Sequence, residues 1–93
     1  MNLTLATRLR LAPHVRFRRF EDEGVVVDQA SAEAVVFNDV AARILELADG
    51  SRTLAECAGV IGGEYEAESD VIEQDVLRFA GELVDAGLAV PAS

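Results

Sequence analysis

Apolar and polar residues alternate in parts of the first third of this chain, whereas apolar residues recur at helical spacing in the rest. Residues 15–18 alternate, and residues 24–28 and 33–37 are rich in valine, which is typical of strands. Turn-forming residues separate the three segments, at positions 21–24 and 29–31. The pattern predicts an antiparallel β-meander with one face packed on helices.

The first helix is predicted at residues 40–49, where apolar side chains recur every three or four positions. Asn38 or Asp39 is expected to cap its start, because a short side-chain oxygen accepts a bond from a free backbone N–H. Gly50 follows the helix, at a position where a left-handed residue is needed.

A second helix is predicted at residues 54–61. Thr53 and Glu56 have the spacing of a capping box, in which each side chain accepts a bond from the other residue's backbone N–H. Two consecutive glycines, at positions 62 and 63, are expected to end this helix.

The third helix, from Ser69 or Asp70 to about residue 86, carries an apolar arc that covers nearly half its circumference. A single contact face needs a stripe of only about 100°. Either strands and helices both pack on this arc, or part of the arc lines a groove for another molecule. A last short strand is predicted at residues 88–90.

These elements predict an α+β fold, winged-helix-like, with a three-stranded antiparallel N-terminal meander followed by three helices. The 93 residues, 51% of them hydrophobic, suffice for one domain with a small core. We expect a flexible arm at residues 1–12, the domain at 13–90 and a tail at 91–93. The following side chains are expected in the core: Phe17, Val35, Phe37, Ile44, Leu54, Ile61, Val76, Phe79 and Leu83.

Charge argues against nucleic acid as a partner. The net charge is −9, and residues 66–85, which include the predicted third helix, hold seven acids and one arginine. A winged-helix protein that reads DNA with this helix would repel the phosphates. Residues 1–20 do carry five arginines and no acid, so a winged-helix transcriptional regulator that binds DNA remains the alternative function.

The residue types of catalytic and metal sites are scarce. His14 is the only histidine and is expected at the surface, and Cys57 lies on the apolar side of the second helix. The acids at positions 64–70 lack the pattern of a calcium loop. We expect no catalytic residue, no metal and no cofactor. With one cysteine, no secretory signal and no apolar run of about 20 residues, we expect a cytoplasmic protein without membrane contact.

The combined spacing of several short motifs resembles the PqqD family over about residues 13–90. The matching positions are Phe37-Asn38, Ile44-Leu45, Asp49-Gly50, Arg52-Thr53, Glu56, Tyr65, Asp75-Val76, Phe79, Leu83 and Gly87-Leu88. The resemblance implies a leader-peptide recognition element, a non-catalytic peptide chaperone of pathways such as pyrroloquinoline quinone biosynthesis. Such a protein holds the leader of a precursor peptide for a maturation enzyme, often a radical SAM protein or a leader protease.

The resemblance further implies that the leader adds as a strand beside the third strand and lies against the third helix. The candidate peptide-binding residues are Glu33, Ala34, Val35, Val36, Phe37, Asp75, Arg78, Phe79 and Glu82. Arg78 would pair with a leader carboxylate, and Asp75 and Glu82 with leader lysine or arginine. An open strand edge beside a wide apolar arc also predicts a weak homodimer.

Overall fold

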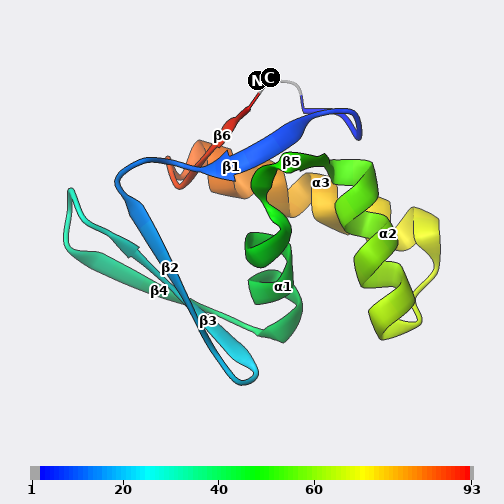
Figure 1. The fold of residues 1–93 in the computed structure, drawn as a ribbon, viewed down its shortest axis with the longest axis horizontal. Helices are drawn as coiled ribbons and strands as arrows, with labels where there is room; N and C mark the ends of the chain where they lie inside the picture. The colour runs from blue at the N-terminus through cyan, green and yellow to red at the C-terminus, as the bar shows by residue number, and fades with distance from the viewer. Residues whose placement is uncertain (1–2, 93) are drawn as a thin grey trace.

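Strands and helices follow one another along residues 3–92, the part of the chain that the computed structural model describes (Figure 1). In chain order they are β1 Arg8–Leu11, β2 Val15–Phe20, β3 Glu23–Asp28, β4 Glu33–Phe37, α1 Asp39–Leu47, β5 Asp49–Thr53, α2 Leu54–Tyr65, α3 Ser69–Asp85 and β6 Ala89–Pro91. The strands form two antiparallel sheets, ordered β2-β3-β4 and β5-β1-β6. This arrangement confirms the predicted α+β class.

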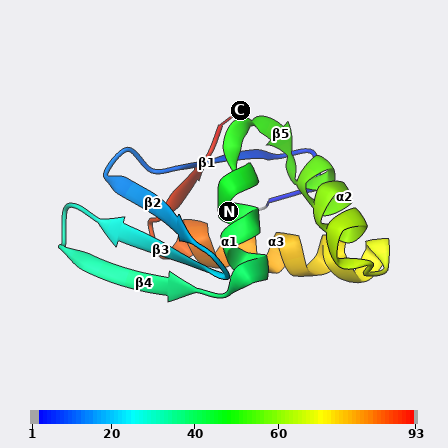
Figure 2. The same ribbon diagram turned by 60° about the horizontal axis from the view of Figure 1, so that its bottom comes forward.

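The β2-β3-β4 sheet is the predicted meander, and it stands beside α1 and α3 (Figures 1 and 2). Val15 and Val26 are buried on the face that meets the helices. Gly24 lets β3 approach α1 closely, because a Cβ at this position would lie 2.7 Å from the Cβ of Ala42. Any larger residue there would push the meander away from the helix.

The second sheet is not foreseen by the sequence pattern. β1 lies between β5 and β6, and its Leu9 is only 1% exposed, so the expectation of a flexible arm is wrong for residues 8–12. The reason is that the partners of β1 are about 40 and 80 residues away in the chain. Residues 1 and 2 of the predicted arm and residue 93 of the predicted tail lie outside the described residues.

The starts of α1 and α2 are capped as predicted. The side-chain oxygen of Asn38 accepts a hydrogen bond from the N–H of Ala41 at 2.9 Å. The capping box is complete: the N–H of Thr53 donates to Glu56 at 2.8 Å, and the N–H of Glu56 donates to the Thr53 hydroxyl at 3.1 Å. These bonds satisfy backbone donors that a helix start leaves free.

Three expected helix ends differ in the structure. Gly50 has the expected positive φ of 85°, but it lies inside β5, and Ala48 ends α1. α2 continues through the glycine pair and ends at Glu66, whose φ is 54°. α3 begins after Glu68, whose side chain makes no capping bond, so the cap expected one or two residues later is wrong.

The core lies where the helices meet the inner faces of the sheets. These expected core residues are buried: Ile44, Leu54, Ile61, Val76 and Leu83. The expected aromatic members, Phe17, Phe37 and Phe79, are half-buried and pack against the core. Val35 corrects the prediction, because it is 42% exposed on the outermost strand of the meander, beyond the cover of the helices.

Candidate functional site: an open strand edge facing a groove

β4 is the outermost strand of the meander, and no described strand pairs with its far edge. The N–H of Gln29 donates to the carbonyl of His14 at 2.8 Å, which fixes the bonded pairs along the sheet. Hydrogen-bonded and non-hydrogen-bonded residue pairs alternate along antiparallel strands. By this alternation Val25 bonds to β2 and the next residue, Val26, bonds to Val35 on β4. The N–H and C=O groups of Ala34 and Val36 therefore point outward along the open edge.

The two outer edges of the meander differ in chemistry. β2 carries three arginines, at positions 16, 18 and 19. Charged side chains on an edge strand are a common protection against unwanted pairing. β4 carries one charged residue, at its first position, and Val35 and Val36 are 42% and 61% exposed. An open apolar edge of this kind is a template for an incoming strand.

Two hollows lie near the contact between β4 and α3, one between α1 and α3 and the other between the meander and the segment that follows α3, and we call the pair the β4–α3 groove. The first, of about 170 Å³, is lined by Asn38, Val40, Ala41, Ile44, Asp75, Arg78 and Phe79. The second, of about 200 Å³, is lined by Val26, Asp28, Glu33, Val35, Ala86 and Leu88. Beside the first hollow, Phe37 and Phe79 meet edge to face with ring centroids 5.5 Å apart, which ties β4 to α3.

The structure brings most of the candidate residues of α3 to this groove. Asp75, Arg78 and Phe79 line the first hollow, and Arg78 forms an exposed ion pair with Asp75 at 3.1 Å. Glu82 is exposed one turn further along α3 and lines neither hollow. The contribution of α1 to the groove was not predicted, although an exposed Val40 in its first turn is a signal of it.

The candidate residues of β4 divide between two faces. Glu33 and Val35 line the second hollow, and Phe37 contacts α3. Ala34 and Val36 turn their side chains to the opposite face and offer only backbone groups to the edge. The part that each residue plays in peptide binding stays a prediction.

The described residues offer little for catalysis. Cys57 is 1% exposed, and burial raises the pKa of its thiol, which disfavours the reactive thiolate. His14 is exposed, with Nε2 3.9 Å from Asp28. Within residues 3–92, no cluster of three histidine, cysteine or acidic side chains could hold a metal ion. No helix in the same range is long and apolar enough to cross a membrane.

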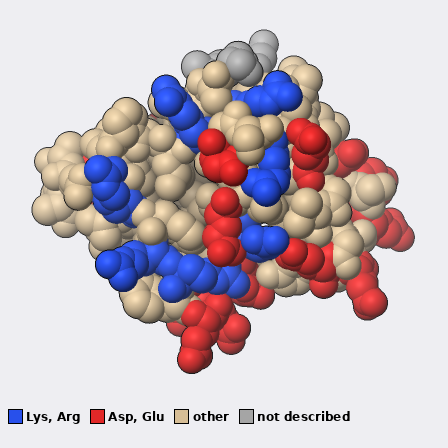
Figure 3. Space-filling model, in the orientation of Figure 1, with Lys and Arg blue, Asp and Glu red and all other residues tan. Residues whose placement is uncertain are grey.

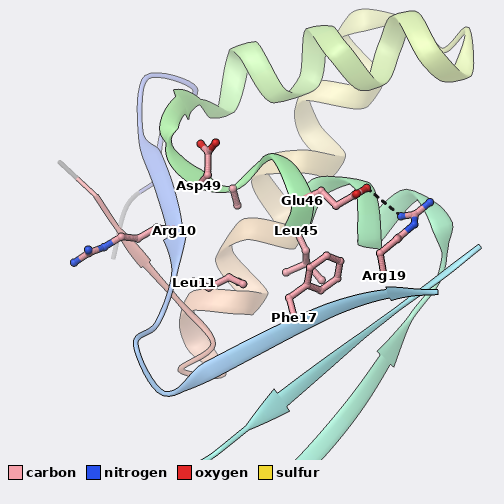
Figure 4. Close-up of a pocket in the computed structure, with 8 residues that line it drawn as sticks. Arg10, Leu11, Phe17, Arg19, Leu45, Glu46 and Asp49 are labelled. Carbon is pink, nitrogen blue, oxygen red and sulfur yellow. Dashed lines mark ion pairs between the residues drawn. The ribbon is translucent and has the colours of Figure 1, made fainter. Parts of the chain in front are cut away.

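An open cleft of about 620 Å³ separates β1 and β2 from α1 (Figure 4). Its apolar lining includes Phe17 and Leu45. Arg19, at the rim, pairs with Glu46 at 3.4 Å and also with Asp39. Since these charges bind one another across β2 and α1, we interpret them as a structural contact that holds the meander on the helix.

The sequence as a whole is similar to known proteins. Residues 23–89 match the model of a family described as coenzyme PQQ synthesis protein D (PqqD). A "PqqA binding protein" of Gluconobacter oxydans is 33% identical over 79 residues, which cover 85% of this chain and 82% of the relative. A protein of the same name from Rhodopseudomonas palustris is 29% identical, covering 98% of this chain and 91% of the relative.

Solved structures share the fold. A lasso peptide synthetase B1 complexed with its leader peptide is 28% identical and has a TM-score of 0.80, covering 90% of this chain and 99% of that chain. The PqqD truncation of Methylobacterium extorquens PqqCD, described as a functional and stand-alone RiPP recognition element, is 25% identical with a TM-score of 0.79. That match covers 96% of this chain and 95% of the other.

Proposed function

The chain belongs to the PqqD family, and from this premise we propose that it is a non-catalytic protein that binds the leader segment of a precursor peptide. The observation that carries the proposal is the open edge of β4, charged only at Glu33, beside the β4–α3 groove. The relatives named for binding PqqA and the B1 protein complexed with a leader peptide support it.

In the proposed mechanism the leader adds as a fourth strand next to β4. The outward N–H and C=O groups of Ala34 and Val36 bond to the leader backbone, which gives affinity without reading sequence. Alternate leader side chains then point toward the helices, where the two hollows of the groove accept apolar anchors. The hollows set the register of the peptide on the strand.

Charges at the groove adjust this binding and do not dominate it. Asp75, Arg78 and Glu82 are solvent-accessible, and an exposed ion pair contributes only about 0.2–1 kcal/mol. Strand pairing and buried apolar anchors must therefore supply most of the affinity. The pairing of Arg78 with a leader carboxylate also competes with its existing bond to Asp75.

The leader held in this way is presented to a maturation enzyme, such as a radical SAM protein or a leader protease. A binding protein of this kind needs no catalytic group of its own, because the chemistry belongs to the partner. The alternative of DNA binding has no comparable support: α3 carries Asp70, Glu73, Asp75, Glu82 and Asp85 against the single Arg78, and this excess of acids opposes phosphate contacts.

A proline at Val36 tests strand addition sharply. Proline lacks an N–H, and the N–H of Val36 points to the open edge, so the meander keeps its own bonds. Val36→Ala is the matched control, because it removes the side chain and keeps the N–H. The probes are synthetic PqqA of Gluconobacter oxydans, the leader peptide of the lasso peptide synthetase B1 complex and peptides of about ten residues selected from a displayed random library.

We expect at least one probe to shift the amide resonances of β4 and α3 in nitrogen–proton correlation spectra. Val36→Pro should abolish these shifts, and Val36→Ala should preserve them. Arg78→Ala should weaken binding by at most about fivefold, as befits an exposed ion pair. Undiminished binding by a Val36→Pro protein that is folded by circular dichroism, or binding of duplex DNA but of no peptide, would refute the proposal.

A further inference from the structure

The face of the meander that points away from the helices, which we call the outer face, is built from alternate residues of its strands. Cross-strand pairs place three rows on it: Arg16, Val27 and Ala34 in the first, Arg18, Val25 and Val36 in the second, and Phe20 and Glu23 in the third. The exposed side of an antiparallel sheet is commonly polar. Here the charged residues are Arg16 and Arg18 on β2 and Glu23 at the start of β3, and the rest of the strips on β3 and β4 is apolar.

This composition indicates a covered surface. β3 has three consecutive valines, so it is apolar on both faces, as strands covered on both sides are. Val36 is 61% exposed and Phe20, at the end of the same face, is 55% exposed. In Figures 1 and 2 no helix or strand of the described chain lies over this side of the meander. An exposed apolar patch of this kind marks an interaction site.

Arg16 and Arg18 give the outer face a positive border. Neither forms an ion pair with any residue from 3 to 92, and Arg16 donates only to the backbone carbonyls of Pro13 and Val15. Figure 3 shows basic side chains over the meander, with an acidic cluster next to them at the lower edge of the molecule. Unpaired cations beside an apolar strip are complementary to carboxylates beside apolar side chains.

We propose that the outer face docks a segment of a partner protein in which apolar side chains are bordered by aspartate or glutamate. The valine strip contacts the apolar side chains, and the carboxylates pair with Arg16 and Arg18. A strand added at β4 would widen the same sheet, so alternate side chains of a bound leader would join this face. We identify this partner as the maturation enzyme, and only this identification rests on the proposed function.

Two other occupants fit the surface less well. If a second copy packed its outer face on the first, the arginines would outnumber the carboxylates, because Glu23, opposite Phe20 at the end of the face, is the only acid on it. An anionic membrane would attract the arginines and repel a chain with a net charge of −9. Both are outcomes that the experiment distinguishes.

The probe is a synthetic amphipathic helix of about five turns with leucine along one side and glutamate beside it. A matched peptide carries lysine in place of every glutamate. The test variant is Arg16→Glu/Arg18→Glu, and the control is Arg8→Glu/Arg10→Glu, which changes the net charge equally on the other sheet. Arg18→Glu alone serves if the double variant loses spectral dispersion.

We expect the glutamate peptide to shift the amides of positions 16, 18, 25 and 27, and the lysine peptide to leave them unchanged. The test variant should bind at least about tenfold more weakly, and the control should bind as the wild type does. Equal binding of both peptides, no binding, or unchanged affinity of the test variant would overturn the proposal. A dimer that forms through this face in sedimentation experiments would overturn the proposal in favour of a second copy. Binding to phosphatidylglycerol vesicles would overturn it in favour of a membrane.

Failure of this proposal is separable from failure of the proposed function. A leader probe moves the amides of the β4 edge and α3, whereas the glutamate peptide moves those of β2 and β3. Loss of one set of shifts with retention of the other therefore identifies which of the two surfaces is wrong.

Discussion

Tyr65 joins the end of α2 to the start of α1 through one hydrogen bond, which its hydroxyl donates to Asp39 at 2.8 Å. This bond, followed by the contact with Arg19, lowers the pKa of Asp39 below its ordinary value of 3.8. The same bond raises the pKa of Tyr65 above its ordinary value of 10.0. Both groups therefore bind their protons differently in the folded and unfolded chain.

The pH dependence of stability should follow from Asp39. A carboxyl whose pKa is lower in the folded state stabilises the fold above the unfolded pKa, and this stabilisation is lost as pH falls through the folded pKa. We predict that the melting temperature of Tyr65→Phe falls less than that of the wild type between about pH 5 and pH 2. The lower limit lies about two units below the pKa of an aspartate in the unfolded chain. An equal fall in melting temperature for the variant and the wild type over that pH range would contradict this account.

Phe79 stabilises α3 against β4 through its contact with Phe37. Because it is half-buried, Phe79→Ala should lower the free energy of unfolding by about 2–3 kcal/mol, less than the roughly 3–5 kcal/mol of a fully buried phenylalanine. For a chain of this size the melting temperature should fall by roughly 10–20 °C. Phe79→Leu keeps most of the apolar volume, so its melting temperature should fall less than half as much. A drop of only a degree or two in Phe79→Ala would show that the contact is unimportant.

Single residues with strong local preferences were predictable from the sequence. Asn38, Thr53 and Glu56 form the predicted caps because capping involves only neighbours in the chain. Val35 was not predictable, because strand periodicity places it on the inner face and cannot tell whether a helix covers that face. Its exposure beside the second hollow is what makes it a candidate anchor.

At the scale of elements, the end of α2 shows how contacts distant in sequence override a local signal. Two glycines at positions 62 and 63 favour a stop, yet the helix continues to Tyr65. Arg43 on α1 binds both carboxylate oxygens of Glu64, at 2.9 and 2.8 Å, and Tyr65 binds Asp39. These contacts hold the last turn of α2 against α1 and offset the flexibility of the glycines.

The glycine pair offers a stabilising substitution. Gly63 lies in the helix without a positive φ, and no atom lies within 4 Å of the position a Cβ would take. Gly63→Ala should raise the free energy of unfolding by about 0.5–1 kcal/mol, because alanine loses less backbone freedom on folding. Urea denaturation measures the change. Gly87→Ala is the opposite control and should destabilise the protein, because Gly87 has a φ of 75°.

At the scale of the molecule, the meander and its open edge were predictable and the second sheet was not. The three strands of the meander follow one another, so periodicity and turns suffice. The β5-β1-β6 sheet joins the two ends of the chain to its middle, which no local pattern reveals. One signal was present: arginine and leucine alternate along residues 8–11, as in a strand with one buried face.

Self-association should use the same edge as the leader. Two β4 strands can pair through their outward groups, so we predict a weak dimer in sedimentation equilibrium experiments. Val36→Pro should shift the protein to monomer, and the peptides that bind the wild type should dissociate the dimer. A dimer that binds these peptides as tightly as the monomer does would show that the two surfaces are separate.

The β5-β1-β6 sheet also decides how the protein can be tethered. The N–H of Ala92 donates to the carbonyl of Arg8 at 2.7 Å, so the C-terminal end of the described chain leaves from this sheet. The sheet and β4 lie on opposite sides of the molecule in Figures 1 and 2. A linker to a catalytic domain could therefore be fused after the last strand without obstructing the open edge of β4. Such a fusion would raise the effective concentration of leader at the enzyme to roughly the millimolar range for a short flexible linker, with no new contact required.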